Sequence, residues 1–221
     1  VDIFFVGKLG PVALATVGLT ESVLMIIYSM GMGLGMAATA MVARRVGEKN
    51  YHEAGNITFQ LLITGFVLSI LTGFFAAYFA PEILELMGGS PEVVAAGTTY
   101  ARIIFAGNLA ILLLFLINGA FRGAGQPHLA MRTLWLSNGI NLVLDPLLIF
   151  GLGSFEGLGL AGAAWATTIG RSIGVLYQLY HLLNGKHLLK IARDNIILSF
   201  RDIFRILKVS VGGMGQFLIE S

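Results

Sequence analysis

Two long runs without a charged residue, 22–43 and 57–80, set the strongest limit on how this chain can fold. A helix needs about 20 mostly apolar residues to cross the hydrocarbon core of a bilayer. Each run meets that requirement, and Pro81 closes the second run at a typical helix boundary. We therefore predict an all-α membrane protein, folded as a polytopic helix bundle.

The composition agrees with this prediction. Of the 221 residues, 56% are hydrophobic and only 12% are charged, whereas soluble domains carry about a quarter charged residues. The chain has no cysteine, which excludes disulfides, Cys-ligated zinc and thiol catalysis. The net charge is +2, but the basic residues fall in short loops between apolar runs. That placement is a topology signal, so we expect no nucleic-acid partner.

Further apolar runs, each bounded by turn signals, extend the pattern along the chain. Besides the two runs above, we expect the tail of a first helix at 1–6, a fourth span from 91 to about 121 interrupted by Arg102, a fifth at about 129–150 and a sixth at about 160–183. The mixed segment 184–201 is typical of a stretch at the membrane interface, and a seventh helix begins near Asp202. The chain lacks an initial Met and ends inside an apolar run, so we expect a piece of a longer protein.

Basic residues orient the spans when alternate loops are assigned to alternate sides of the membrane. One side collects eleven of the fourteen lysines and arginines: Arg44, Arg45, Lys49, Arg122, Arg132, Lys186, Lys190, Arg193, Arg201, Arg205 and Lys208. The opposite side has only Lys8. Positive loops face the cytoplasm. We therefore predict a multi-pass protein of the cytoplasmic membrane whose N-terminus is cytoplasmic.

The fifth span carries the most costly residues for a membrane helix. Asp145 is followed directly by Pro146, and Asn141 lies one turn earlier on the same face. An Asp at a membrane helix centre costs about 2.5–3.5 kcal/mol. Pro146 has no N–H to donate, and its ring collides with the carbonyl of the residue four positions earlier, which lets the helix bend. Intramembrane acids are functional by default, so we interpret this face as a site.

Depth along the helices groups these residues with two others. At 1.5 Å per residue, Asp145 lies roughly 9 Å, Asp2 roughly 8 Å and Thr167 roughly 12 Å inside the outer ends of their helices. Hard oxygen ligands of this kind suit Na⁺, and a buried pair of carboxylates equally suits a proton. We predict a cation site at Asp2, Asn141, Asp145 and Thr167, with possible Na⁺ at the two acids, provided that the side chains converge.

Five segments, in this order and spacing, resemble the multidrug and toxic compound extrusion (MATE) transporters: Val1–Gly10, Val46–Ala54, Arg122–Gln126, Asn141–Pro146 and Gly159–Thr167. The resemblance implies a twelve-helix antiporter with two six-helix lobes. This chain would hold the N-lobe at 1–183, a cytoplasmic linker at 184–201 and the start of helix seven, in the C-lobe, at 202–221. Such proteins export small organic, often cationic, molecules against inward Na⁺ or H⁺; they are not enzymes and need no cofactor. The expected partners are membrane lipid, the substrates and the missing C-lobe.

The resemblance also assigns roles to single residues. Asp2 matches the family's acid in helix one, Asn141 and Asp145 match the Asn and Asp of helix five, and Thr167 matches the Thr of helix six.

Three further positions are weaker matches. Asn118 and Asn108 are candidates for a polar member in helix four. Glu220 resembles an acid of helix seven, but its context at 210–216 lacks the proline often found there.

Other interpretations remain open. Asp145 could be a structural acid bonded to Asn141, and Thr167 could bond back into its own helix. Arg171 is expected to pair with a carbonyl or carboxylate rather than to contact substrate. The same architecture could serve a lipid-linked oligosaccharide flippase, although only Arg102 and Arg171 offer positive charge within spans. A passive channel is a further alternative, and an intramembrane hydrolase lacks a recognisable motif.

Overall fold

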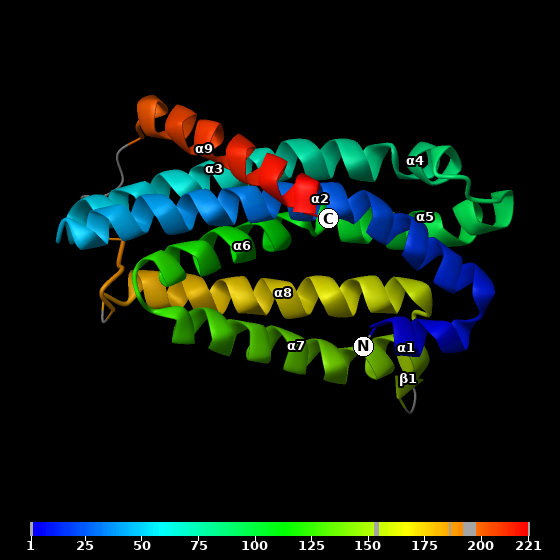
Figure 1. The fold of residues 1–221 in the computed structure, drawn as a ribbon. Coiled ribbons are helices and arrows are strands. Elements are labelled where there is room, and N and C mark those ends of the chain that lie inside the picture. Colours follow the sequence, from blue (N-terminus) through cyan, green and yellow to red (C-terminus); the bar gives the residue numbers. More distant parts are fainter. Residues whose placement is uncertain (1, 153–154, 186, 192–197, 221) are drawn as a thin grey trace.

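A computed structural model describes residues 2–152, 155–185, 187–191 and 198–220 of the chain. Long helices lie side by side in a bundle, as Figure 1 shows. The elements are α1 (Asp2–Val6), the 3₁₀ turn η1 (Gly7–Leu9), α2 (Pro11–Gly47), α3 (Tyr51–Tyr78), α4 (Ala80–Leu86), α5 (Pro91–Ala106), α6 (Asn108–Gly123), α7 (Pro127–Phe150), β1 (Gly151–Leu152), β2 (Phe155–Glu156), α8 (Leu160–Leu183) and α9 (Phe200–Glu220). The predicted all-α fold is confirmed, and the two short strands only form the α7–α8 turn.

Four described helical stretches are long and apolar enough to cross a membrane: α2, α3, α5 with α6, and α7. The helix α8 has the same length as α7. It falls outside this set because its inward-facing glycines and polar residues lower its hydropathy. It nevertheless packs against α5, α6 and α7, inside the bundle.

The fourth span is divided at Gly107 rather than at Arg102, contrary to the sequence prediction. A Cβ atom at Gly107 would lie 2.7 Å from the hydroxyl of Thr168 on α8. The glycine therefore lets α8 approach the point where α5 ends and α6 begins. Arg102 lies inside α5 with its side chain exposed, so a single charge on the outer face does not interrupt the helix.

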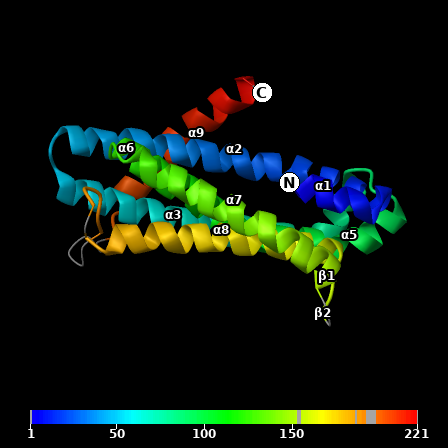
Figure 2. The same ribbon diagram turned by 90° about the horizontal axis from the view of Figure 1, so that it is seen from below.

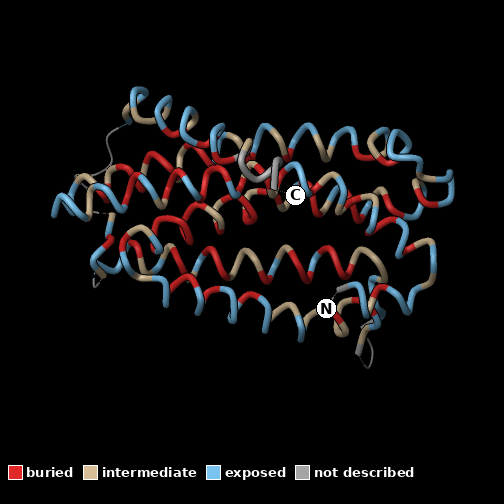
Figure 3. Tube along the Cα trace, viewed as in Figure 1, coloured by how far each residue is buried: buried red, intermediate tan, exposed pale blue. Residues whose placement is uncertain are grey.

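The buried residues gather on the faces that the helices turn toward one another, shown in red in Figure 3. The outer faces carry large apolar side chains. Trp135 is 76% exposed, Phe74 65% and Leu176 63%. Exposed apolar area of this extent marks a surface that contacts membrane.

The loops that hold most of the basic residues lie at one end of the bundle. Figure 1 shows the α2–α3 loop, the α6–α7 loop and the end of α8 together there, while η1, α4 and the β1–β2 turn lie at the other end. The predicted interfacial segment 184–201 falls partly outside the described residues. The helix α9 begins at Phe200, two residues before the predicted start.

Candidate cation-binding cluster

The candidate site lies where α7 and α8 pack against each other. The two helices lie side by side in Figure 1, and in Figure 2 they come together toward the β1–β2 turn. Glycines on α8 make this approach possible. A Cβ atom at Gly170 would lie 2.9 Å from the carbonyl oxygen of Ser137 and 3.4 Å from Cβ of Asn141. Small residues at such an interface let two backbones come together. As a result, Asn141 of α7 directly faces α8.

Asn141 joins the two helices through its amide group. Its Nδ2 atom lies 3.3 Å from Oδ1 of Asp145 and 3.3 Å from Oγ1 of Thr167. The carboxyl group of Asp145 is fully buried, and Thr167 is 8% exposed. Three of the four main predicted residues therefore meet at one place in the interior of the bundle.

The cluster offers oxygen atoms of the kind that bind hard cations. Carboxylate and hydroxyl oxygens suit Na⁺, and a buried carboxyl group is equally able to take up a proton because burial penalises its charged form. In the part of the chain that the structure describes, no group of three or more His, Cys, Asp or Glu residues could hold a metal ion. A cation here would therefore depend on the hydroxyl and amide groups beside the acid.

The side chain of Asp2 lies outside the described residues, so its predicted convergence with Asp145 stays a prediction. The backbone of α1 packs against α7 and α8. The rings of Phe5 and Phe150 meet with their centroids 6.4 Å apart. The helix that carries Asp2 is thus adjacent to the helix that carries Asp145.

The weaker candidates have other partners. Asn108 is fully buried and donates to the hydroxyl of Thr72 on α3 at 2.7 Å. Asn118 accepts a 2.7 Å hydrogen bond from the amide of Gln178. Neither hydrogen bond reaches the cluster. The side chain of Glu220 lies outside the described residues.

Pro146 lies inside α7, directly after the acid of the cluster. The helix runs as one element from Pro127 to Phe150 across it. Whether Pro146 lets the helix bend during a transport cycle stays a prediction.

Arg171 has a different partner from the one predicted. Its Nη2 atom donates to the hydroxyl of Tyr28 on α2 at 3.1 Å, and its Cζ atom lies 5.9 Å from the centre of that ring. The expectation of a carbonyl or carboxylate partner is wrong because α2 brings a phenol to this position. Sequence reasoning missed Tyr28, which is 143 residues away along the chain and belongs to no motif.

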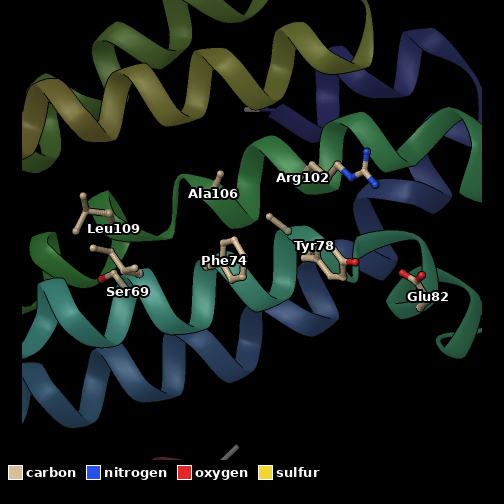
Figure 4. A pocket seen from close by; sticks show the side chains of 10 residues that line it. Ser69, Phe74, Tyr78, Glu82, Arg102, Ala106 and Leu109 are labelled. Atoms are coloured by element: carbon tan, nitrogen blue, oxygen red, sulfur yellow. The ribbon is translucent and has the colours of Figure 1, made fainter.

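A second feature is a cavity of about 760 Å³ between α3, α4, α5 and α6. Figure 4 shows Phe74, Tyr78, Glu82 and Arg102 around it. Its lining runs from Ser69 to Leu109 and includes none of the predicted cation-site residues. The cavity is open at the outer face of the bundle, where its apolar walls face the membrane.

Comparison with known proteins decides the family. The MatE family model matches residues 1–147. The chain belongs to the MatE family. This MatE chain is 29% identical over 195 residues to the FAD transporter of Shewanella oneidensis, covering 88% of this chain and 43% of the relative. It is 30% identical over 188 residues to the probable multidrug resistance protein YoeA of Bacillus subtilis, covering 85% and 41%.

Solved structures show how large a part of a MATE protein this is. A MATE crystal structure in the bent conformation matches with a TM-score of 0.89 at 31% identity, over 98% of this chain and 48% of that chain. A Pyrococcus furiosus transporter described as having a binding pocket of reversed polarity matches with a TM-score of 0.87 at 30% identity, over 98% and 47%. The MatE chain thus spans about half the length of these proteins and has the fold of one lobe.

Proposed function

We propose that the whole protein is an antiporter of the cytoplasmic membrane that exports small organic molecules in exchange for Na⁺ or H⁺. The observation that carries this proposal is the buried contact between Asp145, Asn141 and Thr167. A fully buried acid, bonded to an amide that also reaches a second helix, can gain or lose a positive charge and change how the two helices hold together. The MatE family membership supports transport as the activity.

The proposed site is completed by Asp2 from α1, and Pro146 would let α7 bend as the charge on Asp145 changes. The proposed lobe boundary follows the family pattern: residues 1–183 form the N-lobe, 184–201 link the lobes, and 202–221 begin the C-lobe. Close packing between α9 and α2 supports a close fit between the proposed C-lobe start and the N-lobe. A Cβ atom at Gly213 of α9 would lie 3.1 Å from Cα of Gly33 on α2, so α9 rests closely on the N-lobe.

The names of the relatives leave the charge of the cargo open. They include an FAD transporter and multidrug export proteins. A suitable test therefore uses one anionic and one cationic dye. Fluorescein methyl ester and rhodamine 123 serve this purpose because they share a xanthene ring system and differ in charge.

The test compares full-length wild type with Asp145→Asn in proteoliposomes under an imposed Na⁺ or pH gradient. We expect gradient-driven dye transport to fall by about tenfold or more, because Asn keeps an oxygen that accepts from Asn141 but has no negative charge with which to hold Na⁺ or a proton. Asp202→Asn, an acid in the first turn of α9, is the matched control and should transport at the wild-type rate.

Two results would contradict the proposal. Gradient-driven transport that is unchanged in Asp145→Asn removes the acid from the coupling step. Dye movement that is the same with and without a cation gradient indicates a passive channel, because a channel cannot couple two gradients.

A further inference from the structure

A single guanidinium group lies inside the bundle on α8. Arg171 is partly buried near the middle of Leu160–Leu183, one turn after Thr167. Arginine stays protonated in proteins. A charge within a membrane span is costly and usually marks a functional position. The hydrogen bond from Arg171 to Tyr28 orients the guanidinium but does not offset that cost, because the phenol is neutral.

Arg171 forms no ion pair with an acid among the described residues. The ion pairs of the described part of the chain join Arg44 and Arg45 to Glu48 and Glu53 in the α2–α3 region. The partner of Arg171 is the neutral phenol of Tyr28, which also packs against Phe115 with the ring centroids 6.3 Å apart. Tyr28 fixes the direction of the guanidinium and leaves its positive charge in place.

The guanidinium borders a cavity of about 230 Å³ between α2, α6, α7 and α8. We call this cavity the Arg171 pocket. Besides Arg171 and Tyr28, its polar lining residues are Asn118, Ser137 and Asn138, all of which can donate hydrogen bonds. It has no acidic lining residue among those described. Asn138 and Leu134 are exposed, so the pocket is open at the surface of the described bundle.

The Arg171 pocket is adjacent to the proposed cation site. Arg171 follows Thr167 by four residues on α8, and Ser137 precedes Asn141 by four residues on α7. Residues four apart lie on one face of a helix, about 6 Å apart along its axis. The pocket and the cluster are therefore stacked along the same two helices.

We propose that the Arg171 pocket binds the carboxylate or phosphate group of an anionic substrate. The planar guanidinium donates two parallel hydrogen bonds to such a group, and the amides and hydroxyl around it supply further donors. A cationic substrate would be repelled by the positive charge of Arg171, which borders the pocket. This proposal identifies anions as the substrate class of the export activity proposed above. It rests on that activity only in so far as the bound anion is then transported, and binding is measured separately from transport.

The experiment measures binding of two dyes to purified full-length protein by fluorescence polarisation. The anionic dye is fluorescein, whose free carboxylate is the kind of group that the pocket would bind, and the cationic dye is rhodamine 123. Arg171→Met removes the charge at similar length, and Arg171→Lys keeps the charge but loses the planar fork. Arg102→Met, which removes the exposed arginine of α5, is the matched control. We expect Arg171→Met to weaken binding of the anionic dye by about tenfold or more without weakening the cationic dye, Arg171→Lys to lie in between, and Arg102→Met to match wild type.

Other results of this binding measurement would overturn the proposal or assign Arg171 a different role. Equal loss of both dyes in the two Arg171 variants overturns the proposal and assigns the residue to folding. Unchanged binding of the anionic dye in Arg171→Met, or no binding of it to wild type, also overturns the proposal. If Arg171→Met does not reach the membrane, Asn138→Leu at the exposed edge of the pocket gives the same test, with selective loss of the anionic dye expected. Selective binding without gradient-driven transport supports the pocket and contradicts the antiport proposal instead.

Discussion

The α2–α6 and α7–α8 pairs both depend on glycine for close contact, yet they use polar groups differently. On α2 and α6, a Cβ atom at Gly119 would overlap the carbonyl of Gly35, and the hydroxyl of Thr39 lies 2.9 Å from that same carbonyl oxygen. On α7 and α8, Asn141 reaches the side chains of Asp145 and Thr167. The first pair satisfies backbone groups, and the second brings side chains of different helices together.

The hydrogen bonds at the two helix pairs show how a structural contact can be told from a functional site in such a bundle. A hydroxyl that bonds to the carbonyl four residues earlier is satisfied within its own helix, as at Thr20, Thr58 and Thr64. An amide that bonds to an acid and to another helix holds an arrangement that one helix alone cannot form. The α2–α6 contact also has a polar bond across it, because the hydroxyl of Thr39 donates to the carbonyl oxygen of Gly119 at 3.0 Å. Close contact with such backbone bonds therefore indicates structure, whereas a buried acid bonded to a side chain that also reaches another helix indicates a site.

The largest expected effect tests the packing interface. Gly119→Val forces a side chain into the backbone of Gly35, and we expect it to destabilise the protein by at least ~3 kcal/mol, at the upper end of the overpacking range. Gly139→Val on α7 is the matched control because no atom lies within 4 Å of a Cβ atom there. The measurement is the unfolding temperature of detergent-purified full-length protein. Equal stability of the two variants would show that α2 and α6 are not held by close backbone contact.

A second expected effect tests the polar interface. Asn141→Leu keeps the side-chain size but removes the amide that donates to Asp145 and Thr167. We expect gradient-driven dye transport to fall by about 10–100-fold, corresponding to about 1.5–3 kcal/mol for a hydrogen bond to a charged group. Thr39→Val, which removes the hydroxyl at the α2–α6 contact, should leave transport at the wild-type rate. Similar losses in the two variants would remove the distinction between the two helix pairs.

The smallest expected effect lies outside both interfaces, in the exposed loop after α2. Arg44 and Arg45 hydrogen-bond to Glu48 and hold the pKa of its carboxyl group below its ordinary value of 4.5. A lowered folded-state pKa stabilises the fold above the unfolded pKa, and this stabilisation is lost as the pH falls through the folded value. We expect Glu48→Gln to lower the unfolding temperature slightly at pH 7, with the difference from wild type vanishing on acidification below that pKa. A difference that persists in acid would contradict this assignment.

Much of the fold follows from local pattern. The uncharged runs at 22–43 and 57–80 fall within α2 and α3, because length and apolar character are sufficient to define a span. The shared face of Asn141 and Asp145 was predictable from a spacing of four residues. The division of the fourth span at Gly107 was not, because it depends on Thr168 of α8.

Partners from distant parts of the chain were beyond local pattern. Asn118 and Gln178 are bonded across 60 residues of sequence. The chain turns between the two residues, so no helical period relates them.

By itself, the sequence determined that the chain spans a membrane, where most helices run and which residues of one helix share a face. These properties depend on the apolar character of successive residues and on the fixed 3.6-residue turn of the helix. Only the tertiary structure decided that Thr167 meets Asn141 and that Arg171 meets Tyr28. The physical reason is that such meetings depend on how closely two helices approach, and that distance is decided by glycines and their neighbours on both helices at once.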